Sequence, residues 1–337
     1  MVENQIVQPH ENIVEIEHAV IDYPLRRYTI RAVTDVSLNL KRGAITALVG
    51  ESGSGKTTLA SSLLRCISEP GILSGGEVRF YPAEGAPVEV HKLSPREIDR
   101  FRWEKVSMVF QAAQSALNPV YTVRAQFEET VREHGMKWSR ERIEQKMREV
   151  FDYVKLDYDR VARCYPHELS GGMKQRVMIA FSLLLDPELI ILDEPTTALD
   201  VITQDYIFSI LKRINREKGI SMLLMTHDIG IVAKFADYVG VLYAGRLMEF
   251  GSVFDVFRER RHPYTKGLIR ATPSLIGDLE ALKPIGGSPP DLRNLPQGCV
   301  FSPRCPYCTD ACREREPDTA VQGGRCIKCI HGFEEYE

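Results

Sequence analysis

The sequence lacks several features that would each indicate a class of protein. Basic residues are not in surplus: 43 lysines and arginines stand against 46 aspartates and glutamates, which leaves a net charge of −3. Proteins that bind nucleic acid in bulk usually carry a basic footprint, so this balance argues against such a role. Residues 1–5 contain neither a basic segment nor the start of an apolar one, and we expect no secretion signal.

Long hydrophobic runs are also lacking. A membrane-spanning helix needs roughly 18 or more apolar residues in succession, and one of the longest apolar runs here, residues 177–185, is ended by Asp186 and Pro187. We therefore expect that the chain does not span a membrane by itself and that any membrane role depends on partner chains. The hydrophobic content of 44% over 337 residues still suffices for a packed core. This length predicts one large domain with an appendage, or two domains.

A glycine-rich motif of the form G-x-x-x-x-G-K-[ST] is the strongest signal in the chain. The apolar residues 44–49 before it predict a strand buried on both faces, and the apolar spacing in 59–64 predicts a helix. A strand, a glycine loop and a helix start direct backbone N–H groups and a positive dipole end at one point, which suits a phosphate chain. The segment comprises Gly50, Glu51, Ser52, Gly53, Ser54, Gly55, Lys56, Thr57 and Thr58.

Two side chains of this loop can act directly on a nucleotide. Lys56 can reach the β- and γ-phosphates, and the Thr57 hydroxyl can ligate Mg²⁺. A flexible surface turn could match the motif by chance, but it would not need the flanking strand and helix. We therefore predict a site for a nucleoside triphosphate with Mg²⁺.

A second glycine motif, Leu-Ser-Gly-Gly, occurs twice. In its later copy Ser170, Gly171 and Gly172 precede a helical pattern, so they would lie at a helix N-terminus, which binds anions. A plain helix cap is the alternative interpretation, and this motif alone leaves both open. The earlier copy, residues 73–76, leads into a strand pattern, and there we predict a turn without chemistry.

Polar side chains follow three other apolar runs. Asp193 and Glu194 end one run, His227 follows the next, and Gln111 follows an earlier one. In an open parallel sheet, ligands gather at the carboxyl ends of the strands, so these positions predict one shared site. Asp193 would hold Mg²⁺, and Glu194 would polarise a water attacking the γ-phosphate.

The segments around these motifs predict two smaller units. Residues 13–40 alternate loosely between polar and apolar, which predicts half-exposed strands of an antiparallel subdomain. A tyrosine between these strands could stack on adenine: Tyr23 is the first candidate and Tyr28 the second, with packing inside a hairpin as the alternative for each. Residues 121–162 are charged and predict a helix-rich segment.

The C-terminal part has a different composition. After about residue 256, prolines interrupt regular elements, and six of the eight cysteines lie between Cys299 and Cys329. A nucleotide enzyme without a secretion signal works in a reducing compartment, where clustered thiols indicate metal or cluster ligands before disulfides. Two C-x2-C pairs could form a zinc site, with His331 as a further ligand.

Taken in order, these motifs resemble those of the nucleotide-binding subunits of ABC transporters, over about residues 13–255. The resemblance implies an α/β fold of the P-loop NTPase class in its ABC ATPase form, with ATP as substrate. The Gly50 to Thr58 segment resembles the Walker A loop. The other assigned positions are the Q-loop Gln111, the signature residues Ser170, Gly171 and Gly172, the Walker B Asp193, the catalytic Glu194, the D-loop Asp200 and the switch His227. Met173 departs from the glutamine more usual there, but the phosphate-facing serine and glycines are intact.

The resemblance also implies how the site is completed. In this family two subunits meet head to tail, and each ATP lies between one Walker A loop and the other subunit's signature. The residues expected in catalysis are Glu194, His227, Gln111 and Lys56. Those expected to hold Mg²⁺ are Thr57, Gln111 and Asp193. Beyond the Walker A loop, the expected ATP contacts are Tyr23, Ser170, Gly171, Gly172 and Asp200.

A finer resemblance is to oligopeptide and dipeptide importers. It rests on residues 50–55, 115–119, 171–180 and 262–265. The methionine of the signature resembles D-type subunits, which usually pair with a different F-type subunit, so a heterodimer is favoured over pairing with a second copy. The further implied partners are two transmembrane permease subunits and an extracytoplasmic solute-binding protein, with no nucleic acid. The implied location is peripheral, at the cytoplasmic face of the cell membrane.

Other functions stay open at this point. Relatives of the same subfamily carry sugars or nickel, so peptides are the leading solute and not the only one. A soluble ABC ATPase of DNA repair or translation is disfavoured because the chain has no long coiled-coil insertion and no second nucleotide motif set. A structural metal-binding protein with an inactive nucleotide fold is disfavoured by the intact Lys56, Glu194 and His227.

The importer family also carries a C-terminal extension whose four cysteines hold a [4Fe–4S] cluster in some members. By that resemblance the ligands are Cys299, Cys305, Cys312 and Cys329, and Cys308 and Cys326 are additions. Zinc and free or paired thiols are the alternatives. We expect a structural role, because a short proline-rich segment lacks a core of its own and gains stability from a metal.

The predicted organisation follows. An ABC nucleotide-binding domain covers residues 12–255, with an antiparallel β subdomain and a helical subdomain at about 112–186. A C-terminal extension with the cysteine cluster covers residues 256–337.

Overall fold

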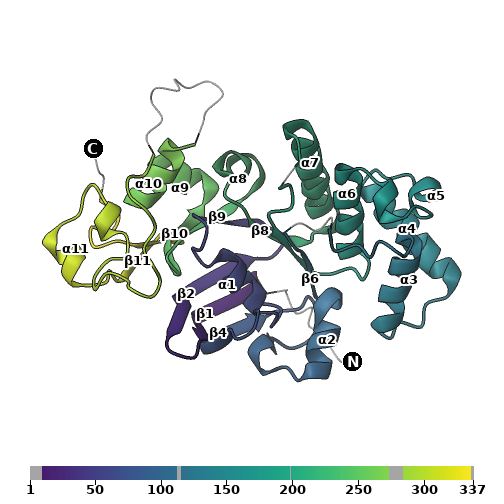
Figure 1. Cartoon of the computed structure of the whole chain (residues 1–337), viewed down its shortest axis with the longest axis horizontal. Coiled ribbons are helices and arrows are strands. Elements are labelled where there is room, and N and C mark those ends of the chain that lie inside the picture. The colour runs from purple at the N-terminus through teal and green to yellow at the C-terminus, as the bar shows by residue number, and fades with distance from the viewer. Residues whose placement is uncertain (1–9, 112–114, 198, 273–283, 335–337) are drawn as a thin grey trace, which may run out of the picture.

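The computed structural model describes residues 10–111, 115–197, 199–272 and 284–334 and is shown in Figure 1. Three expectations fall partly or wholly outside these residues: the lack of a secretion signal (1–5), the start of the predicted helical subdomain (112–114), and parts of the predicted extension (273–283 and 335–337). Figure 1 places helices α3 to α6 at one end of the molecule and α10 and α11 at the other, with the sheets between them.

The larger sheet has eight strands in the order β11-β12-β10-β9-β3-β8-β7-β6. The neighbours from β9 to β6 are parallel. Their bounds are β3 Ile45–Val49, β6 Val106–Val109, β7 Leu189–Asp193, β8 Ser221–Met225 and β9 Tyr238–Tyr243. Every residue of these strands except Tyr238 is buried, as short continuous apolar runs predict for strands covered on both faces.

The smaller sheet is antiparallel, in the order β2-β1-β4-β5. Its strands are β1 Asn12–Pro24, β2 Thr29–Lys41, β4 Ile72–Phe80 and β5 Val88–Glu89. Buried and exposed residues alternate along the second half of β2, so one face of this sheet packs on the core. The antiparallel pairing predicted for residues 13–40 is confirmed.

The turn predicted at residues 73–76 is wrong. Leu73 pairs with Ile21 and Gly75 pairs with Val20, so the segment lies inside β4. Gly76 has a φ of +78°, and an added Cβ would lie 2.3 Å from the His18 carbonyl oxygen. The glycines therefore permit a close approach and a register shift within the sheet, and they do not reverse the chain.

The helical part contains α3 Val123–Glu133, α4 Arg140–Tyr153, α5 Tyr158–Val161 and α6 Gly171–Ser182. Each helix begins after a side chain that accepts a hydrogen bond from its first turn; these caps are Thr122, Ser139, Asp157 and Ser170. The apolar faces pack around Phe127, whose ring lies 5.6 Å from that of Phe151 and 4.0 Å from that of Phe181. The helix-rich segment predicted at 121–162 is confirmed.

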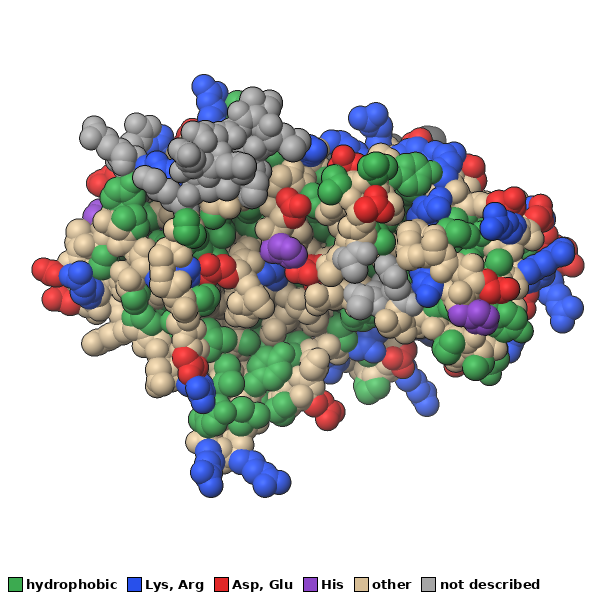
Figure 2. Space-filling view, turned by 45° about the horizontal axis from the view of Figure 1, so that its top comes forward, with side chains coloured by type: hydrophobic (Ala, Val, Ile, Leu, Met, Phe, Trp, Pro, Cys, Tyr) green, Lys and Arg blue, Asp and Glu red, His purple; other side chains and the backbone are tan. Residues whose placement is uncertain are grey.

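The remaining helices surround the two sheets. They are α1 Lys56–Ser62, α2 Pro95–Glu104, α7 Val201–Lys218, α8 Ile229–Phe235, α9 Val253–Glu259, α10 Pro263–Arg270 and α11 Asp310–Glu314, with short 3-10 turns at Val90–Lys92, Pro166–Glu168 and Ser302–Arg304. In the part of the chain that the structure describes, no helix has the length and hydrophobicity of a membrane-spanning segment. On the face shown in Figure 2, basic and acidic side chains are interspersed.

The C-terminal segment continues the larger sheet. β10 Arg246–Ser252 pairs antiparallel with both β9 and β12 Arg325–Lys328, and β11 Thr319–Gln322 forms the edge. A buried ion pair joins β12 to β10: Arg325 Nη2 lies 2.7 Å from Glu249 Oε1, and neither side chain is more than 8% exposed. The cysteine-bearing segment thus shares a sheet with the strands that carry the nucleotide motifs.

Candidate nucleotide-binding site

The glycine loop leaves β3 at Val49 and enters α1 at Lys56, in the order that the sequence predicts. Gly50 has a φ of +147°, and a Cβ there would lie 2.1 Å from the Leu242 carbonyl oxygen. Gly55 has a φ of +98°, and its Cβ would lie 2.7 Å from the Ala32 carbonyl oxygen. Both positions therefore require glycine, which lets the loop lie directly against β9 and β2.

A cavity of about 270 Å³ opens beside this loop. The side chains that line it follow β3, β6, β7 and β8, whose carboxyl ends meet at one edge of the sheet. The lining residues are Ser52, Gly53, Ser54, Gly55, Lys56, Thr57, Thr58, Gln111, Asp193, Glu194 and His227. The structure thus brings together residues that are up to 175 positions apart in the sequence (52 to 227).

Lys56 is buried at the base of the cavity, with 9% of its surface exposed. Its Nζ donates to the carbonyl oxygens of Gly50 at 2.7 Å and Glu51 at 3.1 Å. Burial lowers the pKa of Lys56, and the carboxylates of Glu194 and Asp193 oppose that shift. A phosphate chain beside the ammonium would add negative charge and favour the protonated lysine further.

Thr57 and Asp193 form a second contact in the cavity. Thr57 Oγ1 donates to Asp193 Oδ2 at 3.0 Å. Burial raises the pKa of Asp193, and the hydrogen bond from Thr57 opposes the shift. A hydroxyl and a buried carboxylate are oxygen ligands of the kind that Mg²⁺ takes, and a divalent cation would favour the ionised carboxylate.

Glu194 is held from three sides. Its Oε1 lies 3.1 Å from His227 Nδ1, and its Oε2 accepts hydrogen bonds from Gln111 Nε2 and Thr197 Oγ1, each at 3.1 Å. Its backbone has a φ of +45°, in the left-handed region that non-glycine residues rarely adopt. Strained backbone of this kind persists where the surrounding contacts fix it. Glu194 is therefore a carboxylate in a fixed orientation, able to accept a proton from a bound water.

The Leu-Ser-Gly-Gly helix start lies elsewhere on the chain. Ser170 caps α6 by accepting from the Met173 N–H at 3.3 Å, and Asp200 caps α7 by accepting from the Thr203 N–H at 2.9 Å. Within the described residues, neither they nor Gly171 and Gly172 line the phosphate-loop cavity. One chain therefore does not combine its two anion-binding helix starts in one site.

The two candidate tyrosines lie at the end of β1 and in the loop after it. The Tyr23 ring packs over Gly71, where an added Cβ would lie 2.7 Å from the ring. Tyr28 is 46% exposed. Neither lines the cavity beside the phosphate loop among the described residues, so adenine stacking by Tyr23 stays a prediction.

Two contacts of the site are not predicted from the sequence. Thr197 donates to Glu194, and the only signal for it is a hydroxyl three residues after a strand-end carboxylate. Arg304 Nη1 donates to Glu51 Oε2 at 2.7 Å from a position 253 residues later in the chain. A local pattern carries no information about a contact of that range.

The four cysteines that the resemblance selects lie near one another. Burial, with smaller contributions from the Cys329 and Cys312 thiols, raises the pKa of Cys299 to about 11. Burial raises the pKa of Cys305 to about 12, with contributions from the other three thiols. Burial and the Glu249 carboxylate raise the pKa of Cys326 to about 11, with no contribution from a thiol. Cys326 also packs against a different core cluster from Cys299, Cys305 and Cys312.

The spacing of these thiols bears on which metal they suit. A tetrahedral zinc site with Zn–S bonds of about 2.3 Å places its sulfurs about 3.8 Å apart. In the described part of the chain, no three of the cysteine and histidine ligand atoms lie within 4.8 Å of one another. A preformed tetrahedral zinc site is therefore not seen among the described cysteines and histidines, although Cys312 Sγ lies 3.9 Å from His331 Nε2.

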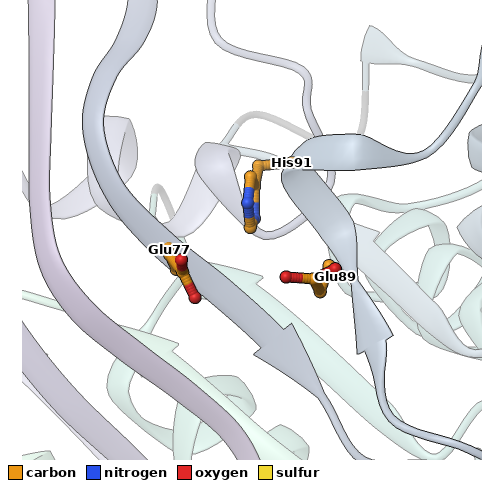
Figure 3. A group of neighbouring side chains, drawn as sticks. All are labelled: Glu77, Glu89 and His91. Carbon is orange, nitrogen blue, oxygen red and sulfur yellow. The ribbon is translucent and has the colours of Figure 1, made fainter.

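Glu77, Glu89 and His91 form another group, with ligand atoms within 4.8 Å of one another. Figure 3 shows them around one space between β4 and β5. Arg79 donates to Glu77, and Lys92 Nζ donates to Glu89 Oε1 at 2.7 Å. Since these side chains already balance both carboxylates, we assign no metal to this group.

Two protein families match the chain. The family described as "ABC transporter" matches residues 33–197, and the one described as "Oligopeptide/dipeptide transporter, C-terminal region" matches residues 248–312. The chain is 39% identical over 323 residues to the dipeptide transport ATP-binding protein DppD of Caldanaerobacter subterraneus subsp. tengcongensis, covering 96% of this chain and 98% of the relative. It is 39% identical over 332 residues to the oligopeptide transport ATP-binding protein OppD of Salmonella typhimurium, covering 98% and 97%.

Solved structures share the fold. The dimeric structure of MJ0796, a bacterial ABC transporter cassette, is similar with a TM-score of 0.61 and 30% identity, over 71% of this chain and 98% of that one. A dimeric post-hydrolysis state of the same cassette, bound to ADP and Pi, gives a TM-score of 0.60 and 30% identity over the same shares.

Proposed function

Because this chain belongs to the ABC transporter family, and within it to the ATP-binding subunits of oligopeptide and dipeptide importers, we propose that it hydrolyses ATP to power the uptake of di- and oligopeptides through partner membrane permeases. The observation that carries the proposal is the cavity that joins the glycine loop and Lys56 to Asp193, Glu194 and His227. A peptide-transporter C-terminal region on the same chain supports the choice of solute.

The proposed roles follow from the contacts in the cavity. Lys56 and the backbone N–H groups of the loop bind the β- and γ-phosphates. Thr57 and Asp193, with Gln111, would hold Mg²⁺, which neutralises charge on those phosphates. Glu194, oriented by His227 and Gln111, accepts a proton from the attacking water. Tyr23 stacks on the adenine.

The proposed active assembly is a dimer. Ser170, Gly171, Gly172 and Asp200 lie outside the cavity of their own chain, and the similar cassette structures are described as dimeric. We assign these residues to the ATP held by a partner subunit, where a helix start and a serine hydroxyl would stabilise the γ-phosphate. An F-type subunit is the proposed partner. ATP would then close the pair, and hydrolysis would let it reopen.

The proposed setting is the cytoplasmic face of the cell membrane. Two permease subunits would carry the solute, and an extracytoplasmic solute-binding protein would deliver it. The opening and closing of the ATP-binding pair would bias the permeases between two states. In this arrangement the solute never contacts the chain described here.

A strain with the gene for this chain deleted tests the transport role. We expect the strain to fail to grow on a dipeptide that supplies a required amino acid, and to regain uptake of the labelled dipeptide with the parent chain but not with Glu194→Gln. A tagged chain should co-purify with two polytopic membrane proteins. If the deletion strain takes up dipeptides normally but has lost uptake of a sugar or of nickel, the proposed solute is wrong. Co-purification with no membrane protein would contradict the importer role.

We extend the proposal to the cysteines: Cys299, Cys305, Cys312 and Cys329 hold a [4Fe–4S] cluster. The mutual proximity of these thiols supports it, since Cys312 and Cys329 act electrostatically on both Cys299 and Cys305. The cluster would join the 3-10 turn, α11 and the segment after β12, which come from distant parts of the extension. Its proposed role is structural, because a metal group would link short, proline-interrupted pieces of the chain.

Replacing Cys299 or Cys305 with serine is expected to remove the bound iron, about four atoms per chain in the parent. Cys326→Ser is the matched control, since that cysteine is half-buried like Cys305 but packs against a different core cluster. Metal analysis and visible absorbance of anaerobically purified protein measure the result. One zinc per parent chain, or loss of iron in Cys326→Ser, would contradict the assignment.

A further inference from the structure

The C-terminal extension makes a direct contact with the phosphate loop. Arg304, at the end of the 3-10 turn Ser302–Arg304, forms a two-pronged ion pair with Glu51. Nη1 donates to Oε2 at 2.7 Å, and Nη2 donates to Oε1 at 2.9 Å. Glu51 immediately follows Gly50, so the contact lies on the loop itself. Paired N–H bonds of this kind fix the orientation of both groups as well as their distance.

Arg304 is buried and all its N–H directions are used. Its side chain is 5% exposed, and that of Glu51 is 26% exposed. Nε donates to the Gly286 carbonyl oxygen at 2.8 Å, and Nη1 also donates to the Tyr243 hydroxyl at 3.2 Å. Nη2 also lies 3.4 Å from the Ile285 carbonyl oxygen. These acceptors fix the guanidinium in one orientation. Because Glu51 is bound to it through two hydrogen bonds, the Glu51 carboxylate is fixed as well.

The backbone of Glu51 is held as well. Its N–H donates to the Tyr264 hydroxyl at 3.1 Å, and its carbonyl oxygen accepts from Lys56 Nζ at 3.1 Å. Tyr264 belongs to α10 and is fully buried, with its ring 4.6 Å from that of Tyr243 and 5.2 Å from that of Phe301. The extension thus fixes the carboxylate and the backbone N–H of Glu51, the residue whose carbonyl oxygen accepts a hydrogen bond from Lys56.

From these contacts we propose that Arg304 and Tyr264 are positioning residues for ATP binding: they hold Glu51, and through it the phosphate loop and Lys56, in the shape that accepts a phosphate chain. The proposal rests on the proposed function of the cavity as the ATP site. ATP affinity then depends on a segment that the ABC transporter family match does not cover. A merely structural ion pair would affect the melting temperature and leave ATP affinity unchanged.

The test uses the purified full-length chain and a fluorescent ATP analogue. We expect Arg304→Ala to weaken binding about tenfold, a change equal to about 1.4 kcal/mol. The affinity of Arg304→Lys should lie between those of Arg304→Ala and the parent, because an ammonium makes a single contact. Arg313→Ala is the matched control: it lies in the same segment, is 62% exposed, and pairs with Asp310 one helical turn earlier. It should bind as the parent does.

A double-mutant cycle separates positioning from general destabilisation. In a Glu51→Ala background, Arg304→Ala should cause no further loss of ATP affinity, since both changes remove the same contact. Tyr264→Phe, which removes only a hydroxyl, should weaken binding a few fold and serves if Arg304→Ala does not fold. Parent-like affinity in Arg304→Ala and Tyr264→Phe, or fully additive losses in the cycle, would overturn the proposal. Failure of the parent to bind ATP would instead overturn the proposed function.

Discussion

Glu194→Gln is expected to reduce the rate of ATP hydrolysis about a thousandfold and to leave ATP affinity within a few fold of the parent value. A positioned general base contributes roughly 10²–10⁴ in rate, and an amide cannot take the proton. Glutamine keeps the size of glutamate and can still accept from Gln111 or Thr197, which now donate to Oε2. The cavity should therefore keep its shape and lose only the proton acceptor.

Phosphate release and fluorescent-nucleotide binding measure the two effects separately. Glu217→Gln is the matched control, because it makes the same chemical change on an exposed residue of α7. The variant should also accumulate as an ATP-bound dimer with its partner subunit, since binding persists while hydrolysis is blocked. A hydrolysis rate within tenfold of the parent would exclude Glu194 as the general base and make His227 the next candidate.

Lys56→Ala is expected to weaken ATP binding at least about a hundredfold, with a matching loss of hydrolysis at fixed ATP concentration. Charge-assisted hydrogen bonds contribute roughly 1.5–3 kcal/mol each, and a tenfold change in affinity corresponds to about 1.4 kcal/mol. The substitution also leaves the carboxylates of Glu194, Asp193 and Glu51, which now interact with the ammonium, without that cation. Their negative charge would then oppose the phosphates.

Titration with the fluorescent nucleotide measures this loss directly. Lys92→Ala is the matched control, since Lys92 is an exposed surface lysine paired with Glu89. The two active-site variants should differ in kind, with binding lost in Lys56→Ala and kept in Glu194→Gln. If Lys56→Ala binds and hydrolyses ATP as the parent does, the cavity is not the ATP site.

The parallel strands and the glycine loop were predictable because each depends on neighbouring residues. Short apolar runs with no polar face can only be strands or helices covered on both sides, and at Gly50 and Gly55 of the loop an added side chain would meet backbone. The family resemblance is confirmed by the matches over residues 33–197 and 248–312. The motifs that carry this resemblance are also short and local, and several of them in one chain are specific for the family.

The incorrect prediction of a turn at residues 73–76 shows where local sequence patterns no longer suffice to predict structure. Glycine pairs occur both in chain reversals and in bulged strands, and the sequence does not distinguish them. The strand that pairs with the glycines distinguishes the two cases: Gly75 pairs with Val20 in β1, more than fifty positions earlier in the chain. The same limit applies to the cysteines, since spacing offers several sets of four but only the folded chain packs Cys326 against a different core cluster from Cys299, Cys305 and Cys312.

The chemistry of the nucleotide site can therefore be read from the amino-acid order, because a phosphate chain is bound mainly by one short loop and its adjoining helix. What holds that loop in place cannot be read in this way. Arg304 and Tyr264 reach Glu51 across 253 and 213 positions, and such contacts form only when the folded chain brings the C-terminal extension against the loop. Long-range pairing depends on the packing of the whole chain, which local residue preferences do not encode.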